Sequence, residues 1–388
     1  MARTYNFISA DSHIEVPCEH WTTWVEKKFQ DMAPRHIKLP NGGDGFLVEG
    51  SSIYTGGMNL YAGLTPEKFS PIGLKWDEMP GTGPGEQRLR EQDQDGVDAE
   101  VLYPGVGGVR GLTRGIKDNN AYKAMVRGYN SWLAKEYCAV DRDRLIGVGC
   151  LPERGLDDAI EEMEYCAKIG LKTVELAAFP TGKAYPTPED DKFWAAALDM
   201  KMPVTVHVAF MKKLGRGEAA MKYPKQPEEH QRPADYVTRL ARYGIRGALN
   251  AGQMVMSGLF DRFPSLRIYW AENQLGWIPI YLEQMDHNYL RHRHWVERIL
   301  GLKPLKRMPS EYIREHMYWG FFDDPIGVRL RHEVGVDRIL WGADFPHVES
   351  EWPNSRKLLA ERFEGVPEKE QHKMVAGNAI EFFRLNGA

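Results

Sequence analysis

Short apolar runs rich in β-branched residues recur along this chain of 388 residues, and helical patterns separate most of them. Each run has the length and composition of a buried strand. Strands that alternate with helices are typical of a parallel sheet, because each helix carries the chain back to the starting edge. The eight runs lie at residues 5–13, 99–105, 144–152, 171–180, 203–210, 266–273, 317–324 and 338–347.

Eight strand–helix units predict an α/β fold, a (β/α)8 TIM barrel that occupies residues 1–388 as a single domain. The segment 156–169 illustrates the helical pattern, and Gly170 is placed to end that helix. An open doubly wound sheet is the alternative. A dinucleotide-binding sheet of that kind would carry GxGxxG after an early strand, and the motif is missing there.

Two segments are longer than a barrel requires. Residues from about 16 to 90 separate the first two predicted strands and read mostly as loop, with a small hairpin predicted at 45–54. A polar insertion at about 211–235 follows the fifth strand. Long loops at this end of a barrel shape or cover an active site, or form oligomer contacts.

Composition excludes several classes of protein. Hydrophobic residues make up 43% and charged residues 27%, as in an ordinary globular enzyme. The net charge of −4 gives no basic footprint for nucleic acid, and no apolar run has the length of a membrane span. The first residues lack the apolar core of a secretory signal, and the four cysteines form no CxxC pair. We therefore expect a reduced, cytoplasmic protein.

Metal-ligand residue types occur at the ends of five of the eight predicted strands, where barrel enzymes place their chemistry. Each one alone has an ordinary explanation as a hydrogen-bonded core histidine, a helix cap or a salt-bridged carboxylate. Together they would repel one another at one end of a barrel unless a cation compensated them. The sequence therefore predicts a metal centre. Its candidates are Asp11 and His13 from the first strand, then Glu175, His207, Glu272 and Asp344.

Two further residues flank these candidates. Glu15 continues the alternation of Asp11 and His13, and we expect it to steady a metal-bound histidine rather than to bind the metal. His347 follows Asp344 by three residues and could act as an acid, a substrate contact or a further ligand, or simply bond to the backbone. Weaker candidates for contact with the substrate are Tyr103, Arg110 and His20.

The chain resembles the amidohydrolase superfamily, in the branch of the aminocarboxymuconate-semialdehyde, resorcylate-type and carboxyvanillate-type decarboxylases. The resemblance spans nearly the whole chain and depends on Asp11-x-His13, on His207 and on the segment WGADFPH around Asp344. It implies that Asp11, His13, His207 and Asp344 bind a divalent metal, Zn, Mn or Fe. It further implies that Asp344 serves as a base, that the substrate is a small molecule, and that the protein forms a homo-oligomer or pairs with a paralogue.

The chain departs from this family at two strands. The branch usually has a histidine at the end of the sixth strand, where this sequence has Glu272, or Asn273 if the register slips by one. Glu175 falls where dinuclear members of the superfamily place a bridging ligand. Either both glutamates form salt bridges in the wall of a site with one metal ion, or they help to bind two metal ions.

Three functions follow from these alternatives. The first is a metal-dependent enzyme that acts by hydrolysis or non-oxidative decarboxylation on a small carboxylated or carbonyl compound. The second is a dinuclear Fe or Fe/Mn monooxygenase on the same barrel. The third is a metal-binding, non-catalytic subunit.

Overall fold

The computed structural model describes residues 3–40, 42–49, 51–53, 60–69, 73–105, 109–208, 210 and 245–385. All eight predicted strands are present, and every pair of neighbours in their sheet is parallel. The predicted (β/α)8 barrel is therefore confirmed. Its strands are β1 (Ile8–Ile14), β5 (Ala99–Pro104), β6 (Leu145–Cys150), β7 (Thr173–Glu175), β8 (Val204–His207), β9 (Ile268–Ala271), β10 (Met317–Phe321) and β11 (Ile339–Trp341).

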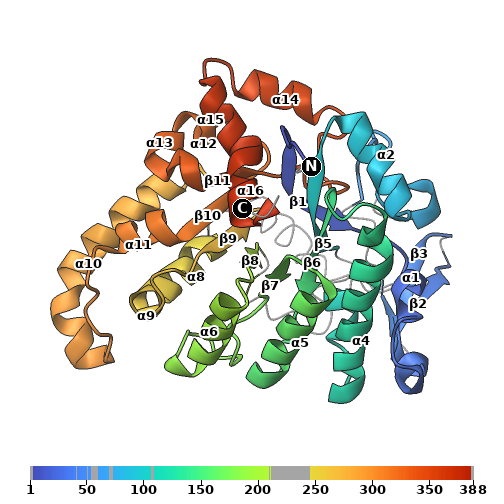
Figure 1. Ribbon diagram of the computed structural model, residues 1–388, viewed down its shortest axis with the longest axis horizontal. Helices are drawn as coiled ribbons and strands as arrows, with labels where there is room; N and C mark the ends of the chain where they lie inside the picture. The colour runs from blue at the N-terminus through green and yellow to red at the C-terminus, as the bar shows by residue number, and fades with distance from the viewer. Residues whose placement is uncertain are drawn as a thin grey trace.

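Helices surround the strands (Figure 1). Gly170 ends α5 in the left-handed conformation, with φ of 91°, as its sequence position predicted. In the described part of the chain, no helix is both long and apolar enough to cross a membrane. The helices are α1 (Glu19–Thr22), α2 (Gly85–Asp95), α3 (Val109–Thr113), α4 (Asn119–Trp132), α5 (Leu156–Ile169), α6 (Asp191–Asp199), α8 (Ile245–Met256), α9 (Leu259–Arg262), α10 (Ile278–Leu300), α11 (Pro309–His316), α12 (Pro325–Arg329), α13 (Arg331–Val334), α14 (Ser355–Arg362), α15 (Glu368–His372) and α16 (Asn378–Phe382).

The strands are buried on both faces, so they read as nearly continuous apolar runs rather than as alternating ones. Val101 and Leu340 belong to an inner cluster inside the barrel, whereas Val206 and Trp341 belong to the outer core beneath the helices. Phe382 of α16 packs in the inner cluster as well. The last helix therefore closes the end of the barrel at which the strands begin.

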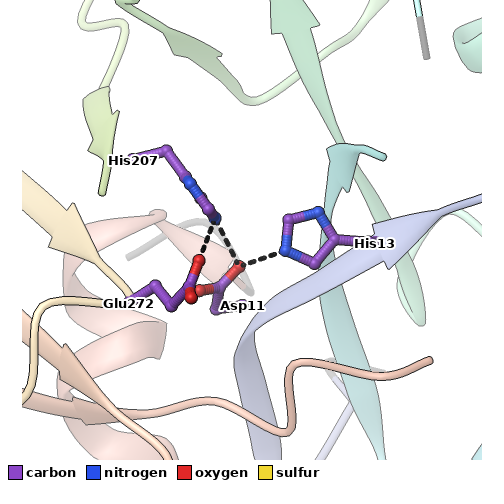
Figure 2. Close-up of side chains that lie close together, drawn as sticks. All are labelled: Asp11, His13, His207 and Glu272. Carbon is purple, nitrogen blue, oxygen red and sulfur yellow. Dashed lines mark ion pairs between the residues drawn. The ribbon is translucent and has the colours of Figure 1, made fainter. Parts of the chain in front are cut away.

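A β-bulge in β1 sets the direction of its side chains. Ser9 pairs with Glu100 and Ser12 pairs with Leu102, so β1 has one residue more than β5 between these two pairs. The extra residue changes which side chains of β1 point inward, because two residues of β1 lie opposite one residue of β5. The side chains of Asp11 and His13 consequently point toward the barrel interior, where Figure 2 shows them with their neighbours.

The first long insertion contains a small antiparallel sheet as well as α1 and the beginning of α2. The hairpin predicted at 45–54 is confirmed, because β3 pairs with β4 in antiparallel register. The second insertion, at 211–235, lies outside the described residues. The small sheet consists of β2 (Arg35–Lys38), β3 (Asp44–Val48) and β4 (Ser51–Ile53), in this order.

The barrel closes where the residues after β11 meet β1. The backbone amide of Asp344 donates to the Asp11 carbonyl at 2.9 Å, and the amide of His13 donates to the Phe345 carbonyl at 2.7 Å. Gly342 lies directly beneath Asp11, and a Cβ atom at Gly342 would come within 2.7 Å of the Asp11 Cβ. We call this junction the barrel seam.

We predict that Gly342→Ala destabilises the protein by about 1–3 kcal/mol, because the added methyl group overpacks the barrel seam. Gly115→Ala is the matched control, since a Cβ there would meet no atom within 4 Å. Urea unfolding of the two variants measures the difference. Equal stabilities would show that the seam tolerates the extra carbon atom.

Candidate metal centre

Four side chains from three strand ends converge inside the barrel (Figure 2). Asp11 and His13 come from β1, His207 ends β8, and Glu272 directly follows β9. One ligand atom from each of them lies within 4.8 Å of the others. The His207 Nε2 atom is 3.3 Å from Glu272 Oε2 and 3.7 Å from Asp11 Oδ1. We call this set the four-residue group.

A second set shares His13 with the first. His13, Asp344 and His347 also place ligand atoms within 4.8 Å of one another. The Asp344 Oδ1 atom lies 3.0 Å from His13 Nε2 and 3.2 Å from His347 Nδ1. The rings of the two histidines stack with their centroids 3.9 Å apart. Asp344 therefore joins the metal-ligand candidates of β1 to the loop after β11.

Two of the carboxylates come from residues with unusual backbone geometry. Glu272 has φ of 57° and Asp344 has φ of 51°. Residues other than glycine rarely adopt this left-handed conformation, and those that do cluster at functional sites. Glu272 directly follows β9, and Asp344 lies three residues past the end of β11, so each turn directs a carboxylate to the barrel axis.

Burial and charge act together on the second set. Burial lowers the pKa of His13, and the neighbouring His347 lowers it further. Burial opposes ionisation of Asp344, but His347 and His13 outweigh this effect and hold the pKa of Asp344 well below its ordinary value. Burial also opposes the charging of His347, yet Asp344 and Glu15 raise its pKa to about 10. Asp344 and His347 thus form a buried ion pair.

Glu15 contacts His347 of the second set. Its Oε1 atom lies 2.8 Å from His347 Nε2, so Glu15 and Asp344 hold opposite sides of one imidazole ring. Gly105 makes room for this arrangement, because a Cβ there would lie 2.2 Å from the Glu15 carboxylate. The predicted role of Glu15 as a partner of a histidine is consistent with this contact, with His347 as that histidine.

The donors fit a divalent cation. Asp11, Glu272 and Asp344 are buried carboxylates that lie within 4 Å of imidazole nitrogens, and carboxylates gathered in this way repel one another without a cation. The His13 Nε2 atom faces both Asp11 and Asp344, at 3.6 and 3.0 Å. A mixture of imidazole and carboxylate donors accepts Zn, Mn or Fe.

The remaining candidates lie at different distances from the two sets. Tyr103 is buried beside them, with its ring centroid 5.3 Å from that of His207. Glu175 ends β7 but belongs to neither set. Asn273 donates to the carbonyl of Ala271, so its side chain turns back on its own strand. The half-buried His20 of α1 belongs to neither set, and the Arg110 side chain lies outside the described part of the structure.

Comparison with known proteins identifies the family to which this chain belongs. The sequence profile of the amidohydrolase family matches residues 11–385, and the chain belongs to that family. It is 25% identical over 320 residues to a gamma-resorcylate decarboxylase from Rhizobium sp., covering 78% of this chain and 87% of that protein. The predicted membership in an amidohydrolase-related branch is confirmed.

Solved structures share the fold. An amidohydrolase from Mycobacterium avium subsp. paratuberculosis superposes with a TM-score of 0.71 at 19% identity, covering 98% of this chain and 100% of that one. A dihydroxybenzoic acid decarboxylase from Polaromonas sp., with bound manganese and the inhibitor 2-nitroresorcinol, has a TM-score of 0.62 at 20% identity. It covers 99% of this chain and 98% of its own. The family match and the two sets of donors in this chain bear out the expectation of a metal-dependent enzyme with a divalent cofactor.

We predict that Glu272→Gln weakens Mn²⁺ binding by at least about tenfold, because the neutral amide removes a charged oxygen from the four-residue group. Glu175→Gln is the matched control and should bind Mn²⁺ as the parent protein does, with about one ion per chain. Titration of metal-free protein with Mn²⁺ measures both quantities. A larger loss in Glu175→Gln, or two ions per chain, would assign Glu175 to a second metal.

Proposed function

We propose that this protein is a metal-dependent decarboxylase that removes CO2, without an oxidant, from a small hydroxylated or carbonyl-bearing carboxylic acid. The observation that carries the proposal is the four-residue group together with Asp344, which contacts His13 of that group and forms an ion pair with His347. Two of the relatives named above are a gamma-resorcylate decarboxylase and a dihydroxybenzoic acid decarboxylase. Their named substrates define the chemical class to test first.

Four residues of this chain are the proposed metal ligands: Asp11, His13, His207 and Asp344. Glu272 lies against His207 and adds a fifth donor in place of the histidine usual in the related branch. When bound, the cation supplies a positive charge that orients and polarises the oxygen atoms of the substrate. Tyr103 offers a buried aromatic face beside the two histidines, suited to a planar substrate.

Decarboxylation breaks the bond between a carbon atom and its carboxylate, and the electron pair stays on that carbon. A proton must then reach the carbon, so the site needs an acid at this position. We assign this role to the pair of His347 and Asp344, in which protonated His347 holds the proton and its Nδ1 atom lies 3.2 Å from Asp344 Oδ1. His347 can pass a proton to Asp344 along this contact, and Glu15 holds the other side of its ring.

The two other functions have less support. A dinuclear Fe or Fe/Mn monooxygenase requires a second metal and molecular oxygen. The relatives reported above are named decarboxylases and an amidohydrolase, and Glu175 lies outside both sets of donors. A non-catalytic subunit would have one closed metal with no position left for a substrate. Metal content and the dependence of turnover on oxygen distinguish all three.

We predict that the Mn²⁺-loaded protein releases CO2 from at least one member of a panel of hydroxybenzoic acids without oxygen, and that in D2O the product carries deuterium at the vacated carbon. Asp344→Asn should lower kcat by about 100-fold or more, because it removes the proton-transferring group. Asp191→Asn, which alters an ion pair with Arg262 on α9, is the control. Turnover that requires oxygen and yields a hydroxylated product would replace this proposal with the monooxygenase.

We also propose that the protein is a cytoplasmic homo-oligomer. Its four cysteines are free and buried, which suits a reducing compartment. The second half of α10 exposes a set of large apolar side chains that a partner could cover. They are Leu290, Trp295, Ile299 and Leu300.

Sedimentation should therefore show a dimer or a larger assembly, and Ile299→Glu should shift it toward the monomer because a carboxylate resists burial. Ile326→Glu on α12, another exposed apolar site, is the control. A monomeric parent protein that assembles only with a paralogue would favour the mixed complex instead.

A further inference from the structure

A buried polar network lies on the outer face of β1, behind the proposed metal ligands. The guanidinium group of Arg88 in α2 donates from Nε to Glu100 Oε2 at 2.5 Å. Gln92 donates to the same carboxylate oxygen at 2.9 Å, and Ser12 donates to Oε1 at 2.9 Å. Arg88 and Glu100 are only 1% and 3% exposed. We call Ser9, Ser12, Arg88, Gln92 and Glu100 the outer-face network.

Arg88 also donates hydrogen bonds to the backbone at two proposed metal ligands, at His13 itself and next to Asp344. Its Nη1 atom donates to the carbonyl of His13 at 3.0 Å, and its Nη2 atom donates to the carbonyl of Phe345 at 3.2 Å. Phe345 directly follows Asp344, and its carbonyl also accepts the amide of His13. The Cζ atom of its guanidinium group lies 4.5 Å from the Phe345 ring centroid. One side chain therefore bridges β1 and the loop after β11 at the barrel seam.

The two serines extend this bridge into the β-bulge. Ser9 Oγ lies 2.9 Å from the carbonyl of Asp11 and 2.9 Å from Ser12 Oγ. The amide of Ala343 donates to Ser9 Oγ at 2.8 Å. The bulge that turns Asp11 and His13 inward is thus bonded to the residue before Asp344. Movement of either segment would break contacts to the other.

Stability alone does not account for this network. A buried ion pair adds little over apolar residues of the same volume, because both charges must leave water. The planar guanidinium instead supplies donors in a fixed fork, and here they bind one carboxylate and two carbonyl groups from distant segments. A lysine has the same charge but lacks this fork.

We propose that Arg88 is a positioning residue for the metal centre. Held by Glu100 and Ser12, it fixes the spacing between the backbone of His13 and that of Asp344, and so the distance between their ligand atoms. Contacts that orient metal ligands in this way commonly change metal affinity by about 10- to 100-fold when they are lost. The inference depends on the metal site and not on decarboxylation, so it is tested without substrate.

The test compares Mn²⁺ binding to metal-free Arg88→Lys, Ser12→Ala and parent protein, by titration and by the electron paramagnetic resonance spectrum of the bound ion. Arg88→Lys should weaken Mn²⁺ binding by about 10- to 100-fold and broaden the spectrum, because the ligands lose their fixed spacing. Ser12→Ala should have a smaller effect in the same direction, because it removes one hydrogen bond to Glu100.

Arg127→Lys is the matched control, because Arg127 forms a similar pair with Glu162 at 2.6 Å, between α4 and α5. It should lower the melting temperature and leave Mn²⁺ affinity unchanged. If Arg88→Lys lowers only the melting temperature, with Mn²⁺ affinity and spectrum as in the parent, the proposal is overturned. If Arg88→Lys does not fold, Ser12→Ala decides in the same way, and an unchanged affinity and spectrum overturn the proposal.

Discussion

The mutual repulsion of buried carboxylates that face imidazole rings constrains this molecule more than any other interaction. Asp11, Glu272 and Asp344 reach the barrel axis from three different strand ends, and none of these carboxylates is appreciably exposed to water. Like charges in such a medium are tolerated only where a cation or a protonated histidine balances them. The fold must therefore hold these side chains against their mutual repulsion until a metal binds, so the backbone that supports them has to be stiff.

That stiffness is concentrated at the barrel seam, where the first and last strands meet. Asp11, His13 and Asp344 all lie within two residues of the hydrogen bonds that join these segments. The seam therefore closes the barrel and also fixes the backbone that carries three of the proposed metal ligands. The long first insertion contributes to the same frame, because α2 brings Arg88 to the outer side of β1. An insertion that looks like a loop in the sequence thus ends in a helix that supports the site.

The sequence predicted the strands and the convergence of metal-ligand types well, because both depend on local patterns. Buried parallel strands are short apolar runs, and barrel topology then brings their ends together. The β-bulge was not predictable in this way, since it depends on how β1 pairs with β5. Arg88 and Glu100 were missed because a helical arginine and a strand glutamate usually face water, and only the tertiary contact reveals them. Glu15 was predicted to steady a metal-bound histidine, and the histidine that it contacts in the structure is His347.

The glutamate at the end of β9 changes the charge of the site, and this has consequences for the substrate. The two sets of donors and Glu15 include four carboxylates, and Asp344 and Glu15 raise the pKa of His347 against the opposing effect of burial. With all four carboxylates ionised, one divalent cation and protonated His347 leave this cluster with a net negative charge, which would oppose an anionic substrate. A histidine in place of Glu272 would remove that excess charge. An anionic substrate must therefore gain its binding energy from direct coordination and from contacts such as Tyr103, or the site must hold a second cation. The number of metal ions bound per chain therefore bears on substrate recognition as well as on cofactor content.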